Sequence, residues 1–246
     1  RLLAHLRLMN NRSSGKLYLI PVPIAEVDHT MCLPEYNRSV LPQIKHYVVE
    51  SIRSARRFLK TADRTIDIDT LTFYELNKHT APEAIGDYLR PLAEGLDVGV
   101  ISEAGCPAVA DPGADVVALA QRKGYEVVPL VGPSSILLAL MGSGFNGQGF
   151  AFSGYLPIDE KERIERIREL EHRALRRGET QIFIETPYRN LQLLETLTKY
   201  CAPETKLCIA SGLQSESALL KTKTIRAWRG EKPAIHKVPT IFLLGR

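Results

Sequence analysis

Residues 98–130 read VGVISEAGCPAVADPGADVVALAQRKGYEVVPL, and this stretch decides the fold class. Its two apolar runs, 98–102 and 125–130, have the length and composition of buried strands. Between them, residues 114–123 space their apolar side chains as a helix does, and Gly124 is a typical helix stop. A strand, a long loop, a helix and a second strand predict one βαβ unit of a parallel sheet.

The same alternation of apolar runs and helix-like segments extends outward from this unit. It predicts further strands at 17–20, 181–185, 206–210 and 238–244, and helices at 82–95, 159–177 and 187–200. Helix 159–177 carries seven basic and six acidic residues, which is typical of a solvent-exposed helix. Residues 40–62 leave two interpretations open, because they fit one long helix although 47–49 also fits a buried strand.

The domain organisation follows from length and from one glycine-rich segment. A chain of 246 residues with 44% hydrophobic residues is long enough for two α/β domains around mostly parallel sheets. Four glycines between residues 142 and 149 make this segment the best candidate for the junction. We therefore expect an N-terminal α/β domain at 16–147, a C-terminal α/β domain at 148–246, and a tail or vector-derived segment at 1–15.

The composition limits the classes of function. The four cysteines include no C-x-x-C pair and the six histidines form no ligand-like cluster, so we expect reduced thiols, a cytoplasmic protein and no metal site. No stretch approaches 18 uninterrupted apolar residues, so no membrane span is predicted. The net charge of +4 permits a nucleic acid or another phosphate-bearing partner without requiring one.

Two loops are the candidates for chemistry. The loop 102–113, SEAGCPAVADPG, joins a strand to a helix, and loops of this length are uncommon unless they are functional. The turn 131–135, VGPSS, also precedes a helix, where serine hydroxyls either cap the helix or bind a ligand. No G-x-G-x-x-G follows the first strand and no P-loop lysine motif occurs, so neither a Rossmann dinucleotide site nor a P-loop is supported.

Five motifs together resemble a known superfamily. KLYLIPVPI, VISEAGCPAVADPG, VGPSSILLALMGSG, FSGYLP and FIETPYR occur in the order and spacing of the tetrapyrrole methylases, at residues 16–24, 100–113, 131–144, 152–157 and 183–189. Within that superfamily they look most like the ribosomal RNA small subunit methyltransferase I branch. The resemblance implies two α/β domains with S-adenosylmethionine in the cleft between them, and a homodimer. It also implies a strand near 46–50 followed by a helix.

The resemblance also implies the site residues. The cofactor contacts would fall, in the N-terminal domain, on Ile24, Ala104, Gly105, Cys106, Val109, Ser134 and Ser135, and in the C-terminal domain on Ile184, Leu213, Pro239 and Thr240. Cys106 is interpreted as a small loop residue rather than a catalytic thiol. Glu185 is the first candidate for the base that deprotonates a hydroxyl nucleophile. Glu103 and Asp111 are alternative bases, or residues that cap and stiffen the long loop.

The acceptor is less closely implied than the cofactor, because several substrate-facing elements depart from the branch pattern. Ile24-Ala25-Glu26, Glu50-Ser51-Ile52-Arg53 and the segment 211–215 stand where the branch carries other residues. We expect 2′-O-methylation of ribosomal RNA, supported by basic stretches at 38–64 and 221–237. The alternatives are methylation of a tetrapyrrole or another small acceptor, and a catalytically lapsed cofactor-binding protein.

Overall fold

The computed structural model describes residues 13–246, which form two compact units. The first extends to Pro133 and the second begins at Ser134. The structure therefore divides the chain before helix α7 (Ser135–Ser143), earlier than the predicted boundary after residue 147. The reason is packing, because Ala139 and Leu140 of α7 are buried in a core of the second unit. Residues 1–12 of the predicted tail lie outside the described residues.

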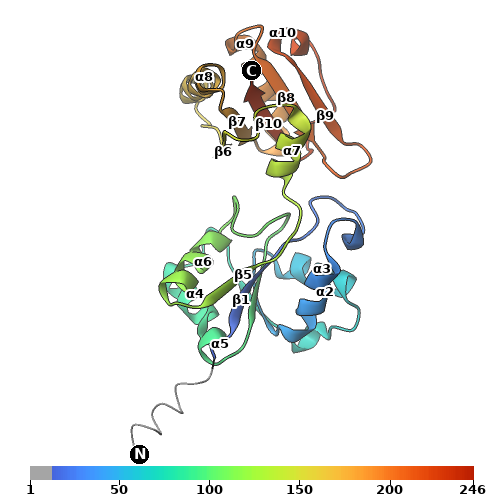
Figure 1. The fold of residues 1–246 in the computed structure, drawn as a ribbon, viewed down its shortest axis with the longest axis vertical. Coiled ribbons are helices and arrows are strands. Elements are labelled where there is room, and N and C mark those ends of the chain that lie inside the picture. The colour runs from blue at the N-terminus through green and yellow to red at the C-terminus, as the bar shows by residue number, and fades with distance from the viewer. Residues whose placement is uncertain (1–12) are drawn as a thin grey trace, which may run out of the picture. The chain divides into compact units, whose positions relative to one another are not determined.

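The first unit contains a five-stranded sheet in the order β3-β2-β4-β1-β5, whose neighbouring strands are all parallel. This confirms the βαβ unit predicted from residues 98–130. Figure 1 labels strands β1 and β5 of this sheet. The strands, in sheet order, are β3 (Thr72–Glu75), β2 (His46–Val49), β4 (Val98–Ile101), β1 (Lys16–Ile20) and β5 (Glu126–Pro129).

Helices cover both faces of this sheet, and each face has its own core. Helices α2 (Glu35–Val40) and α3 (Ile52–Ala62) contribute to the core on one face. The core on the other face draws on α4 (Pro82–Tyr88), α5 (Arg90–Ala93) and α6 (Gly113–Arg122). Alternate residues of β1 enter the two cores, as a strand buried on both faces requires.

Two local expectations of the first unit are resolved. The open segment 40–62 contains strand β2 and then helix α3, which begins at the cap Ser51, whose hydroxyl accepts from the Ser54 amide. The helix predicted over 82–95 is two short helices that meet at Leu89, because Pro91 has no amide hydrogen with which to continue the first. Short 3-10 helices complete the unit: η1 (His29–Met31), η2 (Leu41–Gln43) and η3 (Ile68–Thr70).

The second unit contains a mixed sheet in the order β6-β7-β10-β8-β9. Only β6 and β7 are parallel; the other three pairings are antiparallel, so the prediction of a mostly parallel sheet is wrong here. A short connection, residues 212–218, joins β8 directly to β9 as a hairpin and accounts for one of these pairings. The other two arise because β10 runs opposite to both of its neighbours. The strands are β6 (Phe150–Tyr155), β7 (Thr180–Ile184), β8 (Lys206–Ser211), β9 (Leu219–Thr224) and β10 (Thr240–Gly245).

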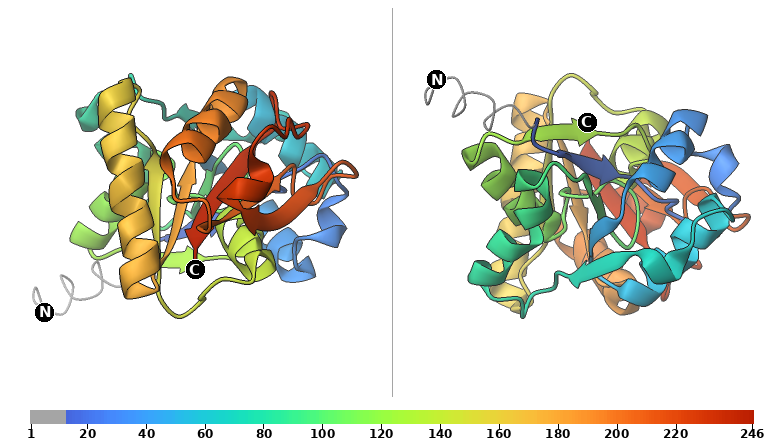
Figure 2. Two further views of the ribbon diagram at one scale, coloured as in Figure 1. Left: turned by 90° about the horizontal axis from the view of Figure 1, so that it is seen from above. Right: turned by 90° about the horizontal axis from the view of Figure 1, so that it is seen from below.

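Helices α8 (Glu160–Arg177) and α9 (Asn190–Tyr200) lie side by side against one face of this sheet (Figure 2). They share a core with α10 (Ile225–Trp228), while α7 packs on the opposite face. Helix α9 follows the 3-10 turn η4 (Pro187–Arg189). The predicted charged helix is confirmed, whereas β9 was not predicted, because its sequence LLKTKT has no apolar run of strand length.

Candidate functional site

Three loops of the first unit converge at one edge of its sheet. Strands β4, β1 and β5 are parallel neighbours, so the loops that follow them leave from the same edge. The Val22 amide donates to the Gly105 carbonyl over 3.0 Å, and the Gly105 amide donates back over 3.1 Å. The Cys106 thiol donates to the Pro133 carbonyl at 3.3 Å. The sequence-predicted residues of this unit therefore lie on loops that bind one another.

Gly105 is the point where these loops come closest. Its φ is +69°, a conformation that favours glycine. A Cβ built on it would lie 3.3 Å from both Ile24 Cγ2 and the Pro133 carbonyl oxygen. The backbone here is consequently both left-handed and tightly enclosed, which explains why only the smallest residue fits.

The long loop after β4 stores backbone strain. Ala108 and Ala110 have φ of 66° and 56°, which costs a non-glycine residue about 1–3 kcal/mol each. Asp111 Oδ1 holds the loop by accepting from the Ala108 amide at 2.7 Å and from the Gly113 amide at 2.8 Å. Asp111 therefore has the stiffening role that was one of its predicted alternatives. Val109 is 50% exposed and Ala104 is exposed, so this loop presents small and apolar groups to solvent.

A group of carboxylates lies beside this loop. Ser54 of α3 donates to Glu103 Oε2 at 3.0 Å. Burial, and then the negative charges of Asp111 and Glu103, raise the pKa of Glu50. Burial also raises the pKa of Asp111, although the hydrogen bonds that it accepts from two backbone amides act to lower it. Glu50, which follows β2, thus belongs to the same acidic region as Glu103 and Asp111 of the long loop.

The serine turn and the cysteine take structural positions. Ser134 is the N-cap of α7, and its hydroxyl accepts a long hydrogen bond from the Leu137 amide at 3.4 Å; the residue is half-buried. Ser135 is the first helical residue and is also half-buried. Burial raises the pKa of the Cys106 thiol, so its thiolate form is disfavoured. Cys106 accordingly fits a packing role rather than a nucleophilic one.

In the second unit, Glu185 is tied into the fold. It follows β7 and is 5% exposed. Its Oε1 accepts from Arg189 at 2.8 Å and from the Thr186 amide at 2.7 Å. Both donors thus occupy the same carboxylate oxygen. The first candidate for the general base is therefore held in a structural ion pair at the start of η4.

The remaining predicted residues of this unit lie on two neighbouring loops. The Gly212 amide donates to the Pro239 carbonyl at 2.9 Å, which joins the loop after β8 to the one before β10. Ile184 and Leu213 are half-buried against the core beneath α7. Thr240 is buried and its hydroxyl donates to Ser211 Oγ at 2.8 Å, so this hydroxyl is used within the sheet.

Sequence reasoning missed the residue that fastens these loops. Asn190 is fully buried, and its amide nitrogen donates to the carbonyls of Ile235 at 2.9 Å and Val238 at 2.7 Å. The strained backbone of Lys237, with φ of 61°, lies within the segment so held. The available signal was an asparagine immediately after the FIETPYR motif, at the start of a helix.

A groove of about 540 Å³ lies between the loop that follows β1 and helix α3. Its walls include Val22, Val27, Phe58 and Ile101, and its polar lining includes Ser54, Arg57 and Glu103. A pocket that combines apolar walls with a few polar groups is the usual form of a small-molecule or nucleotide site. This groove is larger than two other cavities of the first unit, which measure about 140 and 410 Å³.

The basic side chains of the stretch 38–64 are all exposed. Its acidic members are turned inward, since Asp63 is buried and Glu50 is half-buried. Two of the basic side chains have carboxylate partners, in the pairs Arg38–Glu35 and Arg56–Asp69. The exposed basic residues of the stretch are Arg38, Lys45, Arg53, Arg56, Arg57, Lys60 and Arg64. The second stretch, 221–237, likewise has two paired basic side chains, Lys223 with Glu231 and Arg226 with Glu204.

Between residues 13 and 246 no cluster of three or more histidine, cysteine or acidic side chains could hold a metal ion. Across the same residues no helix is both long and apolar enough to cross a bilayer.

Three curated proteins with related sequences carry the same name. The chain is 33% identical over 196 residues to ribosomal RNA small subunit methyltransferase I of Streptococcus pyogenes, and 31% identical over 184 residues to that of Bacillus subtilis. The match to that of Vibrio cholerae is 28% over 197 residues. These alignments cover 78%, 75% and 80% of this chain but 62%, 58% and 64% of the relatives, so the chain spans less than two thirds of their length. No family model matches the chain.

Two solved structures share the fold over nearly the whole chain. The methyltransferase CobJ has a TM-score of 0.63 with 18% identity, covering 95% of each chain. The uroporphyrin-III-C-methyltransferase from Thermus thermophilus has a TM-score of 0.56 with 16% identity, covering 94% of each. At such identities the likeness is one of fold. The comparisons confirm the resemblance that the five motifs predict.

Proposed function

Because the chain has the tetrapyrrole methylase fold and resembles ribosomal RNA small subunit methyltransferase I in sequence, we propose that it is an S-adenosylmethionine-dependent methyltransferase acting on ribosomal RNA. The observation that carries the proposal is the convergence of three loops at the edge of β4, β1 and β5, joined through Gly105. Those loops hold five of the residues implied to contact the cofactor: Ile24, Ala104, Gly105, Cys106 and Val109.

The residues of these loops fit the cofactor. Gly105 exchanges both of its backbone hydrogen bonds with Val22, whereas the preceding residues Glu103 and Ala104 are exposed and present their backbone beside it. Exposed peptide groups are suited to binding the polar ends of a nucleoside and an amino acid. Half-exposed Val109 offers an apolar surface to an adenine ring. When bound, the cofactor supplies an activated methyl group on a sulfonium. The loops then have to fix its position and exclude water, and their strain and internal hydrogen bonds keep them ready for that task.

A ribose hydroxyl must lose its proton as it accepts a methyl group, so a carboxylate is needed nearby. Glu185 remains the prediction from the resemblance, although Arg189 and the Thr186 amide occupy its Oε1. Glu103 is the carboxylate that the groove favours, because it is exposed and lines the cavity beside Ser54. We assign the proton acceptor to one of these two. A loss of methyl transfer at least a hundredfold in either Glu185→Gln or Glu103→Gln identifies it, provided that cofactor affinity is retained.

The charge distribution supports an RNA acceptor. The seven basic side chains of 38–64 are all exposed, whereas Asp63 is buried and Glu50 is half-buried. Such a surface binds phosphates without reading base sequence, and its affinity depends on salt. A ribosomal substrate would also agree with the cytoplasmic location expected from the reduced cysteines, and we carry forward the homodimer as part of the proposal. Light scattering of the purified chain tests the dimer.

The proposal is tested by supplying methyl-labelled S-adenosylmethionine with three acceptors: small ribosomal subunits, a mixture of tetrapyrroles, and buffer alone. We expect label in RNA of the small subunits only. Label in a tetrapyrrole would replace the proposal with methylation of a small acceptor. Cofactor binding by calorimetry without any transfer would instead support a lapsed enzyme that keeps its cofactor site.

A further inference from the structure

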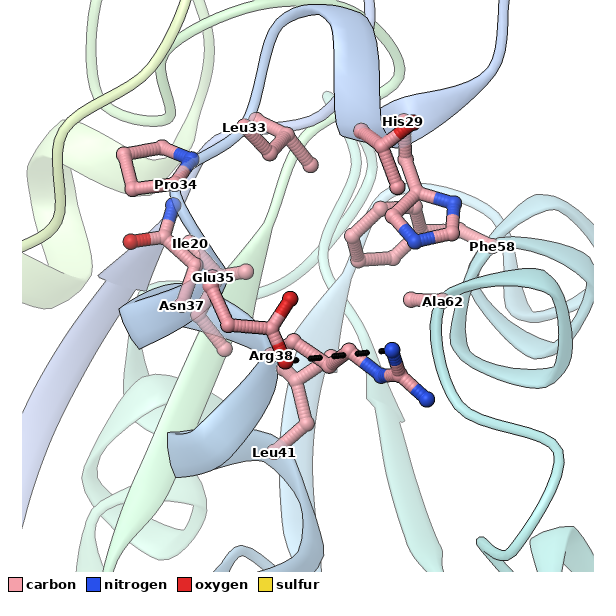
Figure 3. A pocket seen from close by; sticks show the side chains of 11 residues that line it. Ile20, His29, Leu33, Pro34, Glu35, Asn37, Arg38, Leu41, Phe58 and Ala62 are labelled. Carbon is pink, nitrogen blue, oxygen red and sulfur yellow. Dashed lines mark ion pairs between the residues drawn. The ribbon is translucent and has the colours of Figure 1, made fainter.

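A second, smaller cavity opens beside the groove and has no part in the proposed function so far. It measures about 140 Å³ and lies between α2 and α3 within the first unit (Figure 3). Leu33 and Pro34 line it ahead of α2, and Phe58 and Ala62 line it from α3. The ion pair of Arg38 with Glu35, at 3.8 Å, lies at its foot (Figure 3).

One wall of this cavity carries an unsatisfied imidazole. Both ring nitrogens of His29 are buried, and neither has a hydrogen-bond partner in the structure. The carboxylate of Asp28 is 3.7 Å from Nδ1, beyond hydrogen-bond range, and it accepts instead from the amide and hydroxyl of Thr30 at 2.9 and 2.7 Å. Buried polar atoms almost always have partners, so this ring requires one that comes from outside the chain.

The size and lining of the cavity restrict what that partner can be. An apolar protein cavity on the order of 150 Å³ accepts one benzene ring. The His29 cavity has nearly that volume, and most of its walls are apolar, including the fully buried Ile20 and Leu41. A single six-membered ring with polar atoms at its edge would fill it and satisfy His29. A fused two-ring purine would exceed it.

The cavity is also placed for a nucleotide. His29 and Phe58 line both this cavity and the larger groove, so a ring in the cavity would be attached to atoms in the groove. Arg57 lines the groove, and no ion pair within residues 13–246 includes it. A guanidinium free of carboxylates can bind a phosphate. Single-stranded RNA is commonly read by splayed bases that contact aromatic side chains and hydrogen-bond at their edges.

We propose that the His29 cavity binds an unstacked pyrimidine base of the RNA, with His29 hydrogen-bonded to the edge of the ring and Arg57 contacting a neighbouring phosphate. This rests on the proposed function for the presence of RNA. It adds the position at which the chain would discriminate between one-ring and two-ring bases.

The test uses the purified full chain, without cofactor, and two probes: uridine 5′-monophosphate and guanosine 5′-monophosphate. Binding is followed by NMR through the His29 ring protons at low ionic strength. We expect the uridine nucleotide to bind at least fivefold more tightly and to shift the His29 resonances. Equal affinities, or unmoved His29 resonances, would overturn the proposal and leave the cavity to ordered water.

His29→Phe keeps the ring size but removes both nitrogens. It should abolish the fivefold preference while leaving the midpoint of thermal unfolding equal or higher, because no partnered group is lost. Its matched control is His79→Phe, at an exposed histidine that lines neither cavity, and it should keep the preference. If His29→Phe does not fold, Ala62→Met, which fills the cavity from α3, should weaken uridine nucleotide binding. Preference retained in a folded His29→Phe or Ala62→Met variant would overturn the proposal.

These measurements need neither S-adenosylmethionine nor methyl transfer. Transfer to RNA without pyrimidine preference would therefore remove the cavity assignment alone. Pyrimidine binding at His29 without transfer to any acceptor would remove the proposed enzymatic function alone.

Discussion

Replacement of Gly105 by alanine tests the joined loops directly. Alanine at a φ of +69° costs about 1–2 kcal/mol, and its Cβ would lie 3.3 Å from Ile24 Cγ2 and from the Pro133 carbonyl oxygen. The neighbours can relieve that contact only by moving, and both belong to the other two loops. If the bound cofactor requires the native arrangement, the same 1–2 kcal/mol appears as weaker binding. We expect calorimetry to give a Kd for S-adenosylmethionine that is roughly 5–30-fold higher.

Gly124→Ala is the matched control. Gly124 also has positive φ, +73°, but nothing lies within 4 Å of its added Cβ, and it ends α6 rather than joining loops. It should lower the free energy of unfolding by about 1 kcal/mol and leave the Kd unchanged. Unchanged cofactor binding in Gly105→Ala, or equal losses in both variants, would refute the reasoning that the contact at Gly105 shapes the site.

Further predictions concern the RNA surface, the helix cap and the acidic region. Replacing Arg57 and Lys60 together by alanine should weaken RNA binding and reduce the slope of log affinity against log salt by about two, whereas Lys123→Ala should not, as filter binding at several salt concentrations would reveal. Ser134→Ala removes the N-cap of α7 and should cost about 1 kcal/mol in urea unfolding. Glu50, whose pKa is raised by burial, is destabilising when ionised in the folded state, so Glu50→Gln should increase stability at neutral pH. That gain should shrink as the pH falls through the folded-state pKa and vanish below the pKa of the unfolded chain; a gain that persists at low pH would contradict it.

The parts of the fold that sequence predicts well are those with a local cause. The unit at 98–130 has apolar runs of strand length, a helix stop at Gly124 and a loop rich in glycine and proline, and each element formed where expected. The direction of strand β8 relative to β10 has no such cause. It depends on which edge of the sheet the chain reaches after residue 211, and period-two patterns are the same in parallel and antiparallel strands.

The residues of the site also differ in how far the sequence predicts their roles. Motifs identified the loops that contain Gly105 and Cys106, because strand-to-helix loops at a parallel sheet edge are recognisable in sequence. They did not reveal that Glu185 is paired with Arg189, which depends on side-chain geometry in η4. The burial of His29 was equally invisible, since it arises from the packing of α2 and α3, which are separated in sequence by strand β2.

The most direct test of the central claim is the chemical position of the transferred methyl group. After incubation with labelled S-adenosylmethionine, the RNA of small ribosomal subunits is hydrolysed with alkali, which cannot cleave next to a 2′-O-methylated ribose. The account predicts label in an alkali-resistant dinucleotide. Label recovered in a mononucleotide would mean that a base is methylated, and absence of label from RNA that lacks the modification would contradict the proposed activity altogether.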